Sequence, residues 1–82
     1  MVKATLDVYL TRNSKTPDLT FTTKGETIYF TKQKSMNEFK WYVRTNQLTN
    51  IYYFEVIVED DKSGEYLDAD AGYLQNDIFY AC

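Results

Sequence analysis

Apolar and polar residues alternate most regularly at the start of the chain. From Val2 to Leu10 every second residue is apolar, while the residues between them are polar or tyrosine. A period of two is typical of a strand that buries one of its faces. Residues 51–60 alternate in the same way, with an apolar face that runs from Tyr52 to Val58. The pattern therefore predicts two half-buried strands.

Turn-forming residues follow the first of these strands. Residues 13–18 contain the only proline of the chain, so they predict a loop. Alternation resumes over residues 19–31, which are rich in β-branched and aromatic side chains, and Lys24 and Gly25 interrupt it. Because glycine adopts the positive φ of a tight turn without strain, this stretch predicts a β-hairpin.

The C-terminal third contains a second turn. Residues 61–64 have turn-forming composition, and residues 65–68 are expected to return as the antiparallel partner of strand 51–60. Residues 73–82 fit a short helix or an edge strand equally well, and the pattern leaves both open.

The middle of the chain, residues 36–46, carries two competing signals. Ser35 and Glu38 fit a capping box, in which serine and a glutamate three residues later satisfy free N–H groups at a helix start. This pairing favours a helix of about three turns. Residues 39–44 also alternate and have high strand propensity, so a strand remains the alternative.

These elements together predict the fold class. Hairpins with one short helix indicate an α+β fold, in which a small antiparallel sheet of about five strands packs against the helix. The alternative is an all-β fold, if residues 36–46 form a strand. Because no internal repeat, linker or low-complexity stretch divides the chain, residues 1–82 are expected to form a single domain.

Composition excludes several kinds of chemistry. The chain has no histidine and a single cysteine, Cys82, so common zinc or copper sites and internal disulfides cannot be assembled. Ser14, Ser35 and Ser63 have no catalytic base or elbow motif near them in the sequence. We therefore expect a non-enzymatic protein without a cofactor or a metal, located in the cytoplasm and not in a membrane.

Charge is divided unevenly along the chain. Residues 1–50 hold eight basic and four acidic residues, whereas residues 51–82 hold eight acidic residues and one lysine. Acidic side chains gathered on one surface would imitate a row of phosphates and bind a basic groove on a partner. A calcium loop is not indicated, because the spacing around Gly72 does not match the required pattern. The acidic candidates for partner binding are Glu59, Asp60, Asp61, Asp68 and Asp70.

Residues 32–44 interleave cations with aromatic side chains. Single-stranded nucleic acid is bound by such a combination, because bases stack on rings while basic groups follow the phosphates. The same aromatic residues would also serve a small hydrophobic core, and no RNA-binding motif accompanies them. The candidates for this alternative are Lys32, Lys34, Lys40, Trp41 and Arg44.

Tyrosine is unusually common. The chain has eight tyrosines, and a tyrosine on a sheet surface packs its ring while its hydroxyl stays in water, which suits an interface. Cross-strand pairing that merely half-covers the sheet is the plainer explanation. The candidate interface tyrosines are Tyr9, Tyr29, Tyr42 and Tyr53.

These exclusions leave binding as the expected function. We expect a protein-binding domain that self-associates or binds a larger protein, with single-stranded nucleic-acid binding as the alternative. In size, acidity and lack of a catalytic site, the chain resembles in composition the small inhibitors that phages and mobile elements make against host factors, including anti-CRISPR proteins. This resemblance implies that the domain blocks a host protein.

Overall fold

The computed structural model describes residues 1–82 and has an α+β fold, as the sequence predicts. Five antiparallel strands form one open sheet, and a single helix accompanies it. In chain order the elements are β1 (Val2–Tyr9), β2 (Leu19–Gly25), α1 (Ile28–Thr45), β3 (Ile51–Asp60), β4 (Tyr66–Gln75) and β5 (Ile78–Ala81).

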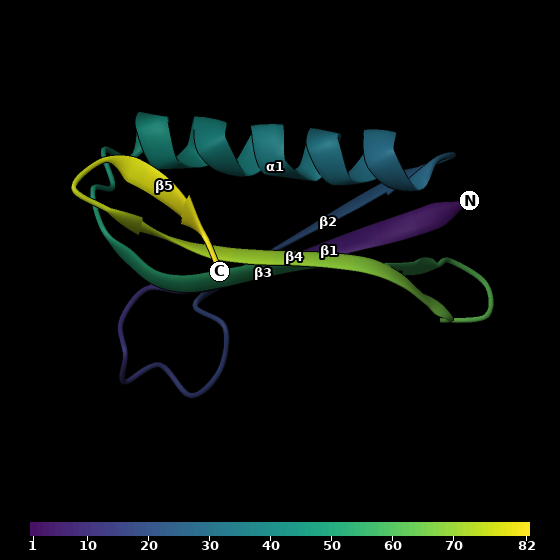
Figure 1. The fold of residues 1–82 in the computed structure, drawn as a ribbon, viewed down its shortest axis with the longest axis horizontal. Helices are drawn as coiled ribbons and strands as arrows, with labels where there is room; N and C mark the ends of the chain where they lie inside the picture. Colours follow the sequence, from purple (N-terminus) through teal and green to yellow (C-terminus); the bar gives the residue numbers. More distant parts are fainter.

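The sheet has the strand order β2-β1-β3-β4-β5. β1 is paired on both sides, so that Val2 lies between Gly25 of β2 and Asp60 of β3. The helix α1 lies along one face of the sheet and packs on β1, β2 and β3 (Figure 1). No element covers the opposite face, beside which only the loop between β1 and β2 projects (Figure 1). We call this opposite side the open sheet face.

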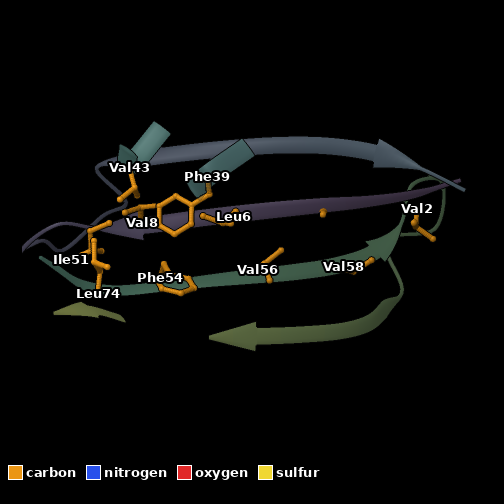
Figure 2. Close-up of a cluster of buried hydrophobic side chains, with 11 residues drawn as sticks. Val2, Leu6, Val8, Phe39, Val43, Ile51, Phe54, Val56, Val58 and Leu74 are labelled. Atoms are coloured by element: carbon orange, nitrogen blue, oxygen red, sulfur yellow. The ribbon is translucent and has the colours of Figure 1, made fainter. Parts of the chain in front are cut away.

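The hydrophobic core lies between α1 and the sheet (Figure 2). Phe39 of the helix is fully buried, and its ring centroid lies 5.0 Å from that of Phe54 and 5.9 Å from that of Phe79. These tilted and edge-on contacts are the favoured geometries for aromatic pairs. The core consists of Val2, Ala4, Leu6, Val8, Phe39, Val43, Ile51, Phe54, Val56, Val58 and Leu74.

The helix begins earlier than the sequence predicts. The hairpin expected over residues 19–31 is wrong after Gly25, because Ile28 already starts α1. Thr27 is the N-cap residue, and its side-chain oxygen accepts a hydrogen bond from the Phe30 N–H at 3.3 Å. The cap therefore satisfies one of the free N–H groups of the first turn and outweighs the strand propensity of the residues that follow.

The expected helix over residues 36–46 is confirmed, but the expected cap is wrong. Ser35 lies inside α1 and is fully buried, so it caps nothing. Because residues 39–44 are helical, the alternative strand and the all-β fold are also excluded. The four buried residues of α1 recur every four positions, as expected for one helix face, and are Thr31, Ser35, Phe39 and Val43.

The C-terminal residues form strands. β4 begins as the expected partner of β3 and continues to Gln75, and β5 then pairs with β4 as an edge strand. The two residues between them, Asn76 and Asp77, have positive φ values of 51° and 69°. This conformation is typical of two-residue hairpin turns, in which Asn and Asp are favoured. The open choice for residues 73–82 is thus resolved in favour of strand.

The alternation expected in β3 is interrupted once. The register of β3 against β4 shifts between Ile51 and Phe54, which indicates a β-bulge or similar irregularity. Consequently Ile51 is buried, while Tyr52 is 59% exposed although the sequence pattern places it on the apolar face. From Phe54 to Val58 the predicted burial is confirmed.

Candidate functional site

The side of α1 that faces away from the sheet carries large exposed aromatic residues. Phe30 and Trp41 are 71% and 66% exposed, and their spacing of eleven residues places them on the same side of the helix. Basic and amide side chains lie between and beside them, all exposed. We call this surface the outer helix face, and it consists of Phe30, Gln33, Lys34, Asn37, Lys40, Trp41 and Arg44.

The outer helix face is positively charged. It contains no acidic residue, and neither its two lysines nor Arg44 takes part in an ion pair. Glu38, the one acidic residue of α1, instead accepts a hydrogen bond from the Thr23 hydroxyl at 3.3 Å. The Arg44 guanidinium lies 5.7 Å from the centre of the Trp41 ring, and the Lys40 ammonium lies 5.6 Å from that of Phe79. Cations and aromatic rings are therefore adjacent here.

Lys32 does not belong to this surface. Its ammonium group lies between two carboxylates of β4, 2.6 Å from Asp68 Oδ2 and 2.8 Å from Asp70 Oδ2. The hydrogen bond to Asp68, followed by that to Asp70, raises the pKa of Lys32, and the same contact lowers the pKa of Asp68. Lys32 thus connects the helix to the sheet, and it is the one proposed nucleic-acid contact that the structure separates from the others.

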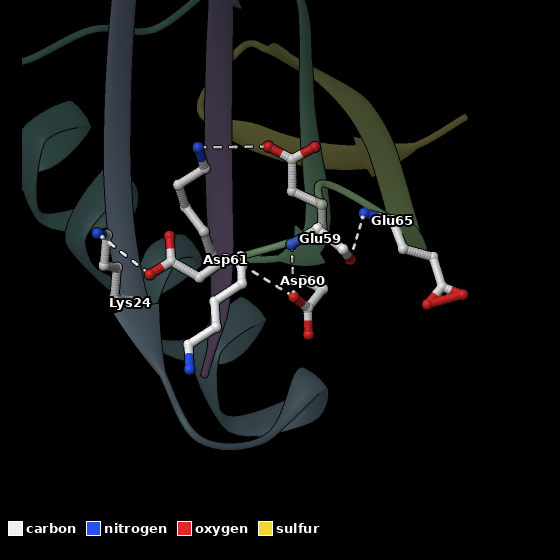
Figure 3. Close-up of polar contacts among 8 residues, drawn as sticks. Lys24, Glu59, Asp60, Asp61 and Glu65 are labelled. Atoms are coloured by element: carbon white, nitrogen blue, oxygen red, sulfur yellow. Dashed lines mark hydrogen bonds and ion pairs between the residues drawn. The ribbon is translucent and has the colours of Figure 1, made fainter.

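The other acidic candidates are also engaged within the molecule (Figure 3). Glu59 lies 3.4 Å from the ammonium group of Lys3, and Asp61 lies 3.3 Å from that of Lys24. The carboxylate of Asp60 accepts two backbone hydrogen bonds, the one from Ser63 being the larger cause of its lowered pKa. The five acidic candidates thus share three lysines, so these ion pairs compensate only part of their negative charge.

The four candidate tyrosines do not share one surface. Tyr9 and Tyr53 meet on the open sheet face with ring centroids 6.0 Å apart. Tyr29 lies on α1 and is 72% exposed, whereas Tyr42 packs edge-on against Phe21 at 5.5 Å. The interface expected from these residues is therefore divided among three places.

Two further tyrosines extend the pair on the open sheet face. Tyr73 of β4 and Tyr80 of β5 lie opposite each other in the sheet and stack with centroids 5.0 Å apart. Burial is the largest cause of a raised pKa for Tyr53, whose hydroxyl donates to Glu55 at 3.2 Å. The alternation of Tyr73 with the buried Gly72 and Leu74 was a signal that could have identified this residue from sequence.

Phe30 is the main residue of the outer helix face that sequence reasoning missed. Its position in a predicted strand concealed its alignment with Trp41, although the i, i+4, i+7, i+11 spacing is visible once α1 begins at Ile28. The structure brings the other four candidates for nucleic-acid binding together on that face; these are Lys34, Lys40, Trp41 and Arg44.

No group of three or more His, Cys, Asp or Glu side chains is placed to hold a metal ion. The structure contains no helix that combines the length and the apolarity needed to cross a lipid bilayer. No known protein family, curated protein or solved structure matches the chain.

Proposed function

We propose that this chain is a non-enzymatic protein-binding domain whose outer helix face binds an acidic surface of another protein. The observation that carries the proposal is the combination on one face of an exposed tryptophan with three unpaired cations and no acidic residue. Tryptophan and arginine are the residues that most often dominate binding energy at protein interfaces. Charge complementarity favours an acidic partner.

The rigidity of α1 supports this proposal. Phe39 and Val43 anchor the same two turns of the helix that present Lys40, Trp41 and Arg44. A surface that is ordered before binding loses less conformational entropy when a partner binds. Because the helix is already formed, binding through the exposed aromatic rings does not have to offset the entropy lost in ordering it.

Nucleic-acid binding is the second candidate function, favoured by the basic residues beside Trp41. The net charge of the chain is −3, which opposes the approach of a polyanion at long range. A protein partner presents its acidic residues only over the area of contact, so this opposition is smaller. Blocking of a host protein by a phage-type inhibitor would use the same surface, and it remains a prediction.

The fluorescence of Trp41, the only tryptophan, provides a direct test. The domain would be titrated with an amphipathic peptide of glutamate and leucine, and separately with a labelled single-stranded oligonucleotide. We expect the peptide to change the fluorescence of Trp41 and the oligonucleotide to leave it unchanged at physiological salt. Binding of the oligonucleotide alone would support the second candidate and overturn the first.

Matched variants identify the surface that binds. Lys40→Ala with Arg44→Ala should weaken peptide binding by about twofold to thirtyfold, because each exposed ion pair contributes about 0.2–1 kcal/mol. Arg12→Ala with Lys15→Ala removes the same charge from the loop between β1 and β2 and should leave binding unchanged. Equal losses in both pairs would show that only net charge matters, and the proposed face would be wrong.

A further inference from the structure

One edge of the sheet is only partly covered by a neighbouring strand. β5 runs beside one end of β4, where it pairs with residues 72–75 (Figure 1). β4 itself begins at Tyr66, and its other neighbour, β3, lies on the opposite side. Residues 66–71 therefore have no strand on their outer side, and we call them the free β4 edge.

Backbone groups of the free β4 edge are directed outward. The Cys82 N–H donates to the Ala71 carbonyl at 3.0 Å, so Ala71 turns its backbone groups away from β3. Because these groups alternate in direction along a strand, Ala69 turns its own to the same side. The Ala71 N–H and the Ala69 carbonyl have no strand partner there, and the Ala69 N–H donates to the carboxylate of the adjacent Asp68 at 2.9 Å. Donors and acceptors are thus presented as a further strand requires.

A groove of about 630 Å³ lies along this edge. Ala69, Asp70 and Ala71 of β4 line it, and Met36 and Lys40 of α1 line it on the helix side. Nine of its twelve lining residues are hydrophobic, so the groove suits a segment that carries apolar side chains. An exposed sheet edge binds such an extended segment by adding it as a further strand, with main-chain hydrogen bonds providing affinity and the side-chain pockets providing specificity.

Charge determines which segment fits. Asp68 and Asp70 lie opposite the core residues Val58 and Val56, so both carboxylates are on the helix side of β4. Lys32 is the one cation paired with them, and the Asp70 side chain remains 62% exposed. One negative charge is therefore uncompensated by these ion pairs. A second copy that paired through the same edge would bring its own two aspartates to these carboxylates, and like charges on adjacent strands oppose pairing.

We propose that the free β4 edge binds an extended segment of a partner protein in which basic and apolar residues alternate. Its basic side chains lie on the helix side, close to Asp70. Its apolar side chains lie on the other side, where the small side chains of Ala69 and Ala71 leave room for them. This surface is separate from the outer helix face, although Lys40 borders both, and neither proposal depends on the other.

NMR titration of the ¹⁵N-labelled chain with a short capped peptide of alternating lysine and valine tests the site. We expect saturable shifts of the Ala69 and Ala71 amides, and slower hydrogen exchange at Ala71 in the complex. The same peptide N-methylated at alternate residues cannot donate these main-chain hydrogen bonds and should bind at least tenfold more weakly. A peptide of alternating glutamate and valine should also bind more weakly.

Three results would overturn the proposal. The first is shifts centred on β2, the other edge of the sheet. The second is equal binding by the N-methylated peptide, since the contact would then not be strand addition. The third is a shift of the Ala69 and Ala71 amides that follows the concentration of the chain alone, because a second copy would then occupy the edge.

Variants separate the charge of the edge from its backbone. Asp70→Asn should weaken binding of the lysine–valine peptide about twofold to fivefold, as expected for one exposed ion pair. Glu26→Gln is the matched control, because it removes an exposed carboxylate next to β2 and should have no effect.

Ala71→Pro removes the outward N–H without changing charge, at an edge position where proline is tolerated, and should weaken binding at least tenfold. Circular dichroism checks that this variant is folded. If Asp70→Asn and folded Ala71→Pro both bind like the unmodified chain, the free β4 edge is not the site. The fluorescence of Trp41 reports on the outer helix face, so failure of that proposal is detected separately.

Discussion

Two hydroxyl groups are buried inside α1 without hydrogen-bond partners, those of Thr31 and Ser35. Both belong to the face of the helix that packs on the sheet. A buried hydroxyl without a partner loses its hydrogen bonds to water and gains none in return, which costs about 1–3 kcal/mol. Thr31 is 1% exposed and Ser35 is fully buried, so neither hydroxyl reaches water and each reduces stability.

Replacing this serine should therefore stabilise the protein. Ser35→Ala removes the unpartnered hydroxyl and improves helix propensity, so we expect the free energy of unfolding to rise by about 1 kcal/mol. Urea denaturation measures the change. Asn37→Ala, at an exposed position of the same helix, should gain only about 0.5 kcal/mol from propensity. A gain from Ser35→Ala no larger than that control would mean that the hydroxyl carries no penalty.

At the scale of elements, one aromatic residue holds the helix on the sheet. Phe39 is fully buried and contacts aromatic rings from three strands: Phe21 of β2, Phe54 of β3 and Phe79 of β5. Lys32 adds a polar connection from the preceding turns of α1 to β4. The outer helix face is consequently positioned by contacts on the opposite side of the same helix.

Truncation of this aromatic residue should destabilise the whole domain. We expect Phe39→Ala to lower the free energy of unfolding by about 3–5 kcal/mol, because a large cavity remains. Thermal unfolding followed by circular dichroism tests this expectation. Phe39→Leu fills most of the space and should cost clearly less. Equal losses for the two variants would show that volume at this position is unimportant.

Gly72 allows the edge strand β5 to approach β4. A Cβ at this position would lie 2.3 Å from the Tyr80 carbonyl oxygen and 2.8 Å from Phe54 Cζ. Gly72→Ala should therefore cost roughly 1–3 kcal/mol and increase hydrogen exchange in β5. Gly64→Ala is the matched control, because its Cβ would meet no atom although the φ of 75° is unfavourable for alanine. A smaller loss at Gly72 than at Gly64 would contradict this account.

The elements in which buried side chains recur with a single period were predictable from sequence. β1 and β3 bury alternate side chains against one helix, so their apolar pattern is regular apart from the irregularity at Tyr52. The first half of α1 gave no such signal, because its buried positions are Thr31 and Ser35. Thr31 lies so close to Gly25 that this position has no room for a leucine, which would have indicated a buried helix face in the sequence. The resulting error at Ile28 concealed that Phe30 belongs to the outer helix face.

At the scale of the whole molecule, the uneven charge of the sequence is only partly retained in space. The C-terminal acids pair with cations from the first half, as in Lys3 with Glu59 and Lys24 with Asp61. Of the six cations that are in no ion pair, three lie on the outside of α1 and three in loops; these are Lys34, Lys40 and Arg44, and Arg12, Lys15 and Lys62 respectively. The sequence indicated both sets of residues, but their pairing depends on strand register and could not be predicted.

These carboxylates should make stability dependent on acid pH. The pKa values of Asp18, Asp60 and Asp68 are lowered, chiefly by hydrogen bonds from Ser14, from the Ser63 N–H and from Lys32 respectively. The unfolded chain then binds protons at higher pH than the folded chain, so stability is complete above about pH 4 and falls below it. Urea denaturation at pH 7 and pH 3 measures the loss.

The variant Asp60→Asn tests how much of this pH dependence comes from Asp60. Asp60→Asn keeps an oxygen that accepts the turn hydrogen bonds but cannot titrate. Its loss of stability between pH 7 and pH 3 should be smaller than that of the unmodified chain. An unchanged loss would mean that Asp60 is not among the groups responsible.

The position of β1 between β2 and β3 affects how the chain folds during synthesis. β1 is made first, and β2 follows soon after, but the register that joins Val2 to Asp60 spans most of the chain. Until residue 60 leaves the ribosome, one edge of β1 has no partner and its apolar side chains lack most of the core. Such contacts between distant residues form late and slowly. A nascent chain that stalls before β3 would therefore expose an unpaired strand edge, which favours association with other unfinished chains.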